Sequence, residues 1–108
     1  MPMRPLKTKH SYHDANIRAV EFEAADSTVF EVELCGCSDI PGATVHLSFH
    51  GVRNIEEVRS FIDALVERAE GRPRIAEIVG IVREDDRRIL MDLDRGPLFI
   101  SARSFMET

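Results

Sequence analysis

Apolar residues recur at helical spacing in one segment of the chain, residues 54–70. They fall three or four positions apart and form a single stripe, made of Ile55, Val58, Phe61, Ile62, Leu65, Val66 and Ala69. Asn54 is placed to cap the first turn with Glu57 reaching back to it, and Gly71 and Pro73 end the segment. Because an isolated helix of this length is marginal in water, we expect the stripe to pack against the rest of the chain.

Apolar and polar residues alternate on both sides of this helix, as they do in half-buried strands. Such segments precede the helix at residues 16–24, 30–34 and 43–50, and follow it at 89–93 and 97–105. Residues 75–82 are apolar on both faces, which indicates a central strand. Ile17 is out of phase with the alternation around it, so we expect a β-bulge near Arg18 and Ala19.

The predicted order of elements is βββ-α-βββ, and short hairpin connections make most neighbouring strands antiparallel. We therefore predict an α+β fold in which an antiparallel sheet of about six strands carries one amphipathic helix on one face. A strongly bent sheet or partial barrel is the main structural alternative. We interpret residues 1–9, which contain two prolines and three positive charges, as a flexible tail. Residues 10–108 are predicted to form a single domain.

The charge is unevenly distributed along the chain. The formal net charge is −5, and the first nine residues contribute +3 from Arg4, Lys7 and Lys9, which leaves −8 for residues 10–108. This acidity argues against a nucleic-acid surface, because neutralising phosphates requires clustered Lys and Arg. It fits a protein that docks on a basic partner, although solubility alone also explains it.

The sequence predicts a cytoplasmic protein that does not enter the membrane. No apolar run approaches the roughly 20 residues that cross a bilayer, and the N-terminal segment has no hydrophobic centre typical of a signal peptide. Cys35 and Cys37 are separated by one glycine and are too few and too close for a disulfide framework. Reduced thiols are therefore expected, and a redox or metal-binding role for them is disfavoured.

The histidines are the main candidates for chemistry. A divalent metal or a small ligand would be held by a set drawn from His10, His13, Asp14, His46 and His50. His46 and His50 lie on the same face of a strand, about 13 Å from each other, so they cannot both bind one metal on a regular strand. One of them can instead contact an acid of the preceding strand, Glu31 or Glu33. In the alternative interpretation these histidines belong to a solvated face, Tyr12 and His13 dock the entry of the first strand, and Asp14 caps a turn.

No motif for catalysis or for a cofactor stands out. The serines lie in no glycine-flanked nucleophile turn, and the chain has no glycine-rich phosphate loop. The acidic stretch at residues 84–94 is interpreted as a turn and a wet strand face. The sequence thus predicts no catalytic residues and no cofactor, and favours a protein that is not an enzyme.

Two short motifs resemble a known group of proteins. Tyr12-His13-Asp14-Ala15-Asn16-Ile17, leading into a strand, and the later Leu47-Ser48-Phe49-His50-Gly51-Val52 are similar to small bacterial proteins grouped with toxin-antagonising immunity proteins. The resemblance covers about the first half of the chain. It implies a non-enzymatic, acidic domain that binds and blocks a protein partner, with no catalytic residues to carry over.

Two functional hypotheses follow. In the first, the chain is a small bacterial binding domain that engages a protein partner or a second copy of itself as a homodimer, and an immunity-like role is one form of this hypothesis. In the second, it is a metal- or small-ligand-binding domain that uses the histidines and Asp14. The second hypothesis requires these side chains to converge in one site.

Overall fold

The computed structural model describes residues 4–5, 8–85 and 87–108. Within them lie one helix, α1 (Ile55–Ala69), and a sheet of eight strands whose pairings are all antiparallel. The strands are β1 (Arg4–Pro5), β2 (Ala15–Ala24), β3 (Ser27–Glu33), β4 (Thr44–His50), β5 (Ala76–Arg83), β6 (Arg88–Leu93), β7 (Gly96–Ser101) and β8 (Ser104–Glu107). The α+β class is confirmed, but the strands described outnumber the six expected.

One additional strand lies in the segment predicted to be a flexible tail. There β1 pairs with Val82 and Arg83 of β5. Beyond β1, the backbone amide of Lys9 donates to the carboxylate of Glu107 at 2.9 Å. Residues 1–3 and 6–7 lie outside the described residues, so the flexibility of residues 1–9 stays a prediction.

The other additional strand arises where one strand was expected over residues 97–105. The chain turns a corner at Ala102 and Arg103, and this corner divides the segment into β7 and β8. The amide of Ala102 donates to the carbonyl of Arg87 at 2.8 Å, and that of Arg103 donates to the carbonyl of His50 at 2.9 Å. The predicted single strand is therefore wrong, because each half finds a different partner: β7 pairs with β6 and β8 with β4.

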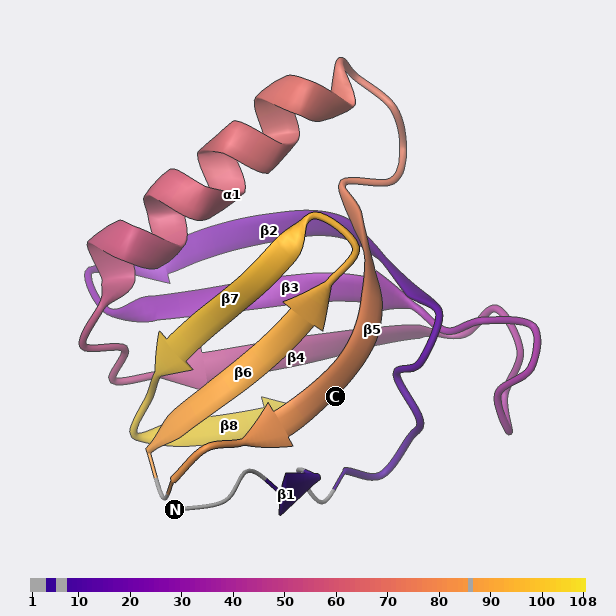
Figure 1. Ribbon diagram of the computed structural model, residues 1–108, viewed down its shortest axis with the longest axis horizontal. Helices are drawn as coiled ribbons and strands as arrows, with labels where there is room; N and C mark the ends of the chain where they lie inside the picture. Colours follow the sequence, from indigo (N-terminus) through magenta and orange to yellow (C-terminus); the bar gives the residue numbers. More distant parts are fainter. Residues whose placement is uncertain (1–3, 6–7, 86) are drawn as a thin grey trace.

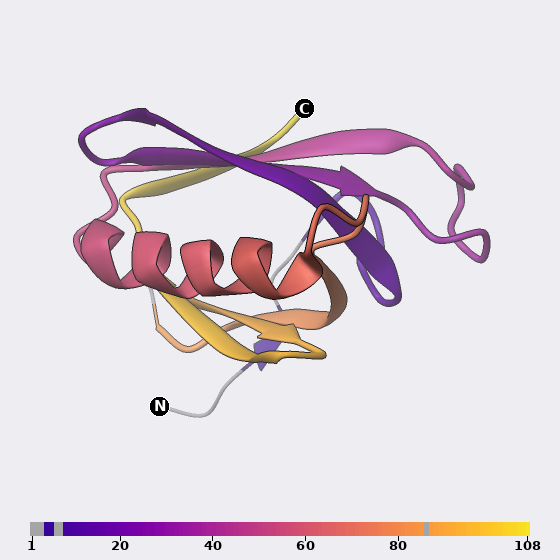
Figure 2. The same cartoon turned by 90° about the horizontal axis from the view of Figure 1, so that it is seen from above.

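The sheet has the order β7-β6-β5-β2-β3-β4-β8, with β1 paired to β5 beside this path (Figure 1). β7 and β8 are consecutive in the chain, yet they are the two outermost strands of this order. The sheet therefore bends until these two edge strands approach each other. Figure 2 shows the result as two layers, with β2, β3, β4 and β8 above β5, β6 and β7. The strongly bent sheet, which the sequence left as the alternative, describes this architecture best.

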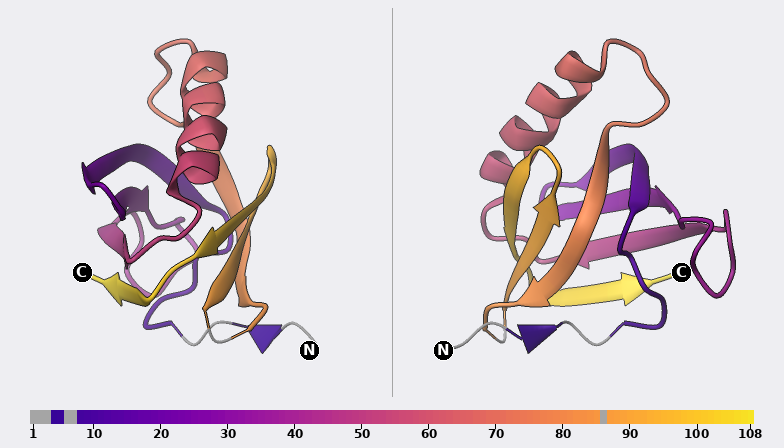
Figure 3. Two further views of the ribbon diagram at one scale, coloured as in Figure 1. Left: turned by 90° about the vertical axis from the view of Figure 1, so that its left-hand side faces the viewer. Right: turned by 45° about the vertical axis from the view of Figure 1, so that its right-hand side comes forward.

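Helix α1 lies along the opening between the two layers, as the views in Figure 3 show. Its buried residues are Val58, Ile62, Leu65 and Ala69. Val66, which was assigned to the apolar stripe, is 49% exposed, because it lies at the margin of the stripe where neither layer reaches it. On the side of β2, the Arg59 guanidinium lies 4.5 Å from the centroid of the Phe22 ring. The helix thus covers the opening of the core rather than one face of a flat sheet.

The core fills the space between the layers. Its largest fully buried side chains include Phe30, Leu34, Leu47, Phe49, Ile78, Met91 and Ile100. Phe30 and Phe49, on adjacent strands, meet edge to face with ring centroids 5.5 Å apart. The alternation in β3 and β4 therefore predicted which residues face inward.

Two local predictions about the strands are confirmed. The pairing of β2 with β3 shifts register between Ile17 and Ala19, where the bulge was expected. Strand β5 lies in the interior of the sheet order, between β6 and β2, as its apolar faces indicated.

Candidate functional site

Four connections between strands or helix meet at one end of the bent sheet, the left-hand side of Figure 1. They are the β2–β3 turn, the β4–α1 connection, the β5–β6 turn and the β7–β8 corner. Backbone hydrogen bonds join them: Val52 N–H donates to the Asp26 carbonyl at 2.9 Å, and Arg53 N–H donates to the Ser101 carbonyl at 2.8 Å. Together with the bonds of the β7–β8 corner, these contacts hold the four connections in fixed relative positions.

A pocket of about 380 Å³ opens among these connections. We call it the arginine pocket, and its lining residues are Asp26, Gly51, Val52, Arg53, Arg87, Ser101, Ala102 and Arg103. Its volume falls in the range of small-ligand sites, roughly 300–1,000 Å³. The three arginines come from three different connections, and Asp26 is the one acid among the lining residues that the structure describes. The pocket is thus a local concentration of positive charge on a chain whose net charge is −5.

The arginines of the pocket are accessible to a ligand. All three are exposed, and no ion pair between described residues involves Arg53, Arg87 or Arg103. Guanidinium groups bind carboxylate and phosphate oxygens through paired N–H donors, which makes arginine well suited to anions. This arrangement can therefore receive an anionic group.

Gly51 allows Arg103 to take its place in the pocket. Gly51 has φ = +65°, a backbone conformation that side chains disfavour. A Cβ atom at this position would lie 2.7 Å from the Cβ of Arg103 and 3.4 Å from its Nε. The Arg103 side chain therefore passes directly over the glycine, in space that any other residue would occupy.

Asn54 does not cap the helix as predicted, and no side-chain hydrogen bond caps α1. Its Nδ2 instead donates to the Phe99 carbonyl at 2.8 Å, and its Oδ1 accepts from the Ser101 amide at 2.9 Å. The two bonds attach the start of α1 to β7, because the tertiary partners compete successfully with the helix's own first turn. They also fix Ser101 at the edge of the arginine pocket.

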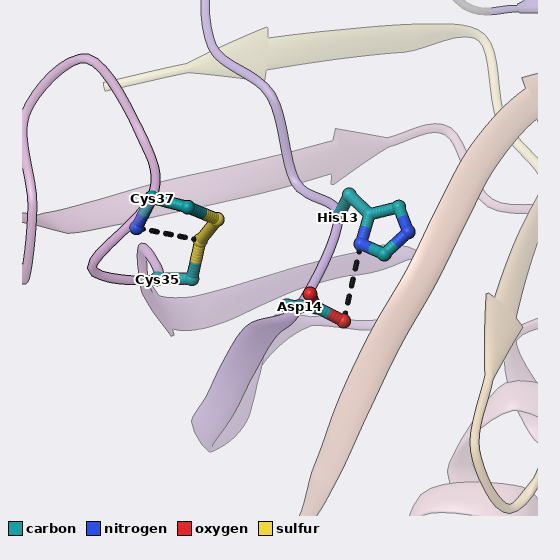
Figure 4. Close-up of a disulfide and its surroundings, with 4 residues drawn as sticks. All are labelled: His13, Asp14, Cys35 and Cys37. Atoms are coloured by element: carbon teal, nitrogen blue, oxygen red, sulfur yellow. Dashed lines mark hydrogen bonds and ion pairs between the residues drawn. A yellow bond between two sulfur atoms is a disulfide. The ribbon is translucent and has the colours of Figure 1, made fainter.

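The histidines near the N-terminus do not form the predicted site. His10 Nδ1 lies 3.6 Å from a carboxylate oxygen of Asp39, whereas His13 Nδ1 lies 3.1 Å from Asp14 Oδ1. His13 is exposed, so it does not dock the strand entry, and Figure 4 shows it directed to Asp14. Tyr12 does dock there: it is 4% exposed and its hydroxyl donates to Glu107.

The histidines of β4 also have separate partners. His46 Nε2 lies 3.7 Å from Glu31 Oε1, which confirms the expected contact with an acid of the preceding strand. The Nδ1 atom of His50 lies 3.2 Å from the Ser27 hydroxyl. Within the described residues, no group of three or more His, Cys, Asp or Glu side chains is arranged to hold a metal ion. The histidines and Asp14 are thus distributed over several contacts rather than gathered in one.

Cys35 and Cys37 form a disulfide, so the expectation of reduced thiols is wrong for this structure (Figure 4). The prediction rested on the number and close spacing of the two cysteines, which one glycine separates. The backbone turns here, with the Ser38 amide donating to the Cys35 carbonyl at 3.1 Å, and the Cα atoms of the cysteines lie 5.3 Å apart. That separation is within the range that a disulfide spans.

The arginine pocket was missed from the sequence. Its residues are distributed over positions 26 to 103, and no local motif joins them. The available signal was composition, because arginine outnumbers lysine twelve to two and no lysine follows Lys9. That bias suits paired recognition of anions, but it does not say which arginines lie together.

Comparison with known proteins identified no relative: no family model, no curated protein and no solved structure matches this chain. The resemblance to immunity proteins therefore stays a prediction. Among the described residues, no helix has the length and apolar character needed to cross a membrane.

Proposed function

We propose that this chain is a non-enzymatic binding domain that recognises a protein partner through an anionic group of that partner, held in the arginine pocket. The observation that carries the proposal is the meeting of three arginines from three connections around one pocket of about 380 Å³. Hydrogen bonds fix the backbone around them, so little ordering of the connections is needed when a partner binds.

The lining residues favour binding over catalysis. Proton transfer needs a positioned acid or base, and a serine nucleophile needs an adjacent base. Ser101 lines the pocket, but no histidine lies among the described lining residues, and His50 contacts Ser27. The arginines supply positive charge and hydrogen-bond donors, which bind a ligand without reacting with it.

The acidic exterior favours a protein partner over a nucleic acid. On the outer face of β2, β3 and β4, Glu21, Glu23 and Glu31 surround a shallow hollow of about 220 Å³ together with Val29 and His46. An extended polyanion would meet these carboxylates as well as the arginines, whereas a protein can present one anionic group to the pocket. An immunity-like role, in which the domain blocks the partner it binds, is part of this proposal.

A matched pair of variants tests the proposal. Arg53→Ala/Arg87→Ala/Arg103→Ala removes the pocket charges, and Arg68→Ala/Arg72→Ala/Arg95→Ala removes three arginines near the other end of α1. Both variants change the net charge equally, so a general electrostatic effect weakens both alike. In a pull-down from lysate of the source organism followed by calorimetry with the purified partner, the wild type and the control variant are expected to bind.

The pocket variant is expected to lose the partner while keeping its circular dichroism spectrum. The proposal is contradicted if the folded pocket variant still binds the partner, or if the control variant loses the partner to the same extent. Self-association stays a separate prediction, and light scattering at several protein concentrations measures it.

We also propose the cytoplasm as the location of the protein, and the cysteines provide the test. Thiols of cytosolic proteins are kept reduced, and their disulfides are rare or transient. If the protein is cytoplasmic, the disulfide of the structure forms only after the protein leaves the cell, so alkylation at the moment of cell lysis is expected to label Cys35 and Cys37. If both remain protected until a reductant is added, the proposed location is wrong and the protein belongs to an oxidising compartment.

A further inference from the structure

The charge of the arginine pocket suits a dianion better than a monoanion, an inference that rests on the proposed function. Three guanidinium groups and the Asp26 carboxylate give the described lining residues a formal charge of +2. A single carboxylate would leave part of that charge unmatched. A phosphate monoester carries about −1.5 to −2 at pH 7 and matches it closely.

The hydrogen-bonding groups point to the same class of ligand. Each guanidinium carries donors and no acceptor, and the Ser101 hydroxyl lines the pocket beside them. A phosphate monoester offers three strong acceptor oxygens in a compact tetrahedron. Donors arriving from Arg53, Arg87 and Arg103 on different connections can approach such a group from different sides.

A second cluster of arginines provides an internal comparison. A hollow of about 200 Å³ near the C-terminal end of α1 is lined by Arg68, Arg72, Arg74 and Arg95, among other residues. Of these arginines, Arg74 pairs with Glu77 at 3.0 Å, Asp94 also lines the hollow, and the helix end carries partial negative charge.

The arginine pocket lies at the opposite end of the same helix, where the partial charge is positive. Arg53 precedes Ile55, the first residue of α1, by two positions. Glu56 and Glu57 belong to the first turn, but neither lines the pocket. The partial positive charge of the helix end and the nearby carboxylates of Glu56 and Glu57 oppose each other, so the charge of the pocket is set by its lining residues.

We infer that the arginine pocket binds a compact dianion of the phosphate class, presented as a phosphate monoester. The acidic remainder of the chain restricts the ligand to one such group, because a run of phosphates would extend over carboxylates. The ligand chemistry is shared by a phosphorylated side chain of a protein and a small phosphorylated metabolite. The proposed function favours the first source.

Titrations followed by amide NMR test the inference. Inorganic phosphate and sulfate are expected to shift the amide signals of Gly51, Ser101 and Arg103 at pH 7.5, and acetate is expected to bind at least about tenfold more weakly. Replacing Arg103 by alanine is expected to weaken phosphate binding about tenfold or more, since a charge-assisted hydrogen bond contributes about 1.5–3 kcal/mol. Arg103→Lys keeps the charge without the paired donors and is expected to lose less.

Two further variants sharpen the result. Asp26→Asn raises the formal charge of the lining residues from +2 to +3, so phosphate binding is expected to tighten several-fold. Arg72→Ala, in the second cluster, is expected to leave the affinity at Gly51 and Ser101 unchanged. The inference is overturned if Arg103→Ala and Asp26→Asn both stay folded and bind phosphate with the affinity of the wild type.

The remaining outcomes separate the inference from the proposed function. If acetate binds as well as phosphate, the pocket is an anion site without preference for dianions: the inference fails and the proposed function stands. If no anion binds, both fail. A short phosphoserine peptide and its unphosphorylated twin identify the source. Binding of inorganic phosphate without binding of the phosphopeptide supports the inference and overturns the protein partner.

Discussion

The Tyr12 hydroxyl donates a hydrogen bond of 2.5 Å to a carboxylate oxygen of Glu107, joining the segment before β2 to the last strand of the sheet. Burial of the phenol, followed by its hydrogen bond to Glu107 and the negative charge of that carboxylate, raises the pKa of Tyr12 well above its ordinary value. The phenol should therefore stay neutral in the folded protein at a pH where the unfolded chain has lost the proton.

The free energy of unfolding should therefore fall at alkaline pH. Because the pKa of Tyr12 is raised on folding, its contribution to stability is fully present below the unfolded pKa of about 10 and is lost as the pH rises above it. The chain contains one tyrosine and no tryptophan, so phenolate absorbance at alkaline pH reports Tyr12 alone. We expect ionisation to coincide with unfolding.

Tyr12→Phe is the matched variant for this prediction. It should cost about 1 kcal/mol of unfolding free energy at neutral pH through loss of the hydrogen bond, and its stability should fall less steeply above about pH 10. Denaturant titrations at a series of pH values measure both effects. A tyrosine that ionises near pH 10 in the folded wild type would contradict the burial and hydrogen bonding described above.

Asn54 is expected to stabilise the fold through its hydrogen bonds to β7 and not as a helix cap. Asn54→Ala removes the bonds to Phe99 and Ser101 and should lower the unfolding free energy by about 1–3 kcal/mol. Asn54→Asp separates the two roles, because aspartate is a good cap but cannot donate to the Phe99 carbonyl. If the aspartate variant is as stable as the wild type in denaturant titration, the capping role is the correct one.

Gly51 is expected to tolerate no side chain. Gly51→Ala combines an unfavourable backbone conformation, about 1 kcal/mol or more, with the 2.7 Å approach to the Cβ of Arg103. Gly42 is the control, because its φ of +73° is similar and no atom lies within 4 Å of a Cβ built there. Thermal unfolding should show a larger loss at position 51 than at position 42, and equal losses would place Arg103 elsewhere.

The disulfide is expected to make a moderate contribution to global stability. It closes a loop of three residues, for which the chain-entropy relation gives about 1.6 kcal/mol as an order of magnitude. Thiol labelling of the folded protein, followed by intact-mass measurement, should add no label before reduction and two labels after it. Cys35→Ser/Cys37→Ser should keep the fold and unfold at a clearly lower urea concentration than the wild type, by roughly 0.5–1.5 M.

The regular parts of the fold could be predicted because their patterns are local. The helix was expected over residues 54–70 and spans Ile55–Ala69, and the alternation in β3 and β4 identified the inward-facing residues correctly. The corner at Ala102 was harder to see, since Leu98, Ile100 and Ala102 are all buried and continue one alternation. The change of phase to Phe105 was the one local signal that the strand ends there.

The candidate site could not be predicted because it depends on strand order. Arg53, Arg87 and Arg103 become neighbours only when the sheet bends and brings four connections to one end. No local pattern specifies that β5 pairs with β2, or that β8 returns to β4. The histidines were selected by residue type alone, and residue type does not determine where a side chain lies.

The return of β8 to β4 also sets the order in which this chain can fold. β4 ends at His50 and its partner begins at Ser104, so one side of β4 stays an unpaired edge until β8 has been made. Pairings between residues so far apart in sequence form slowly. We expect the nascent chain to be most vulnerable to aggregation just before β8 is added, and a chain truncated after Ala102 to remain in that state.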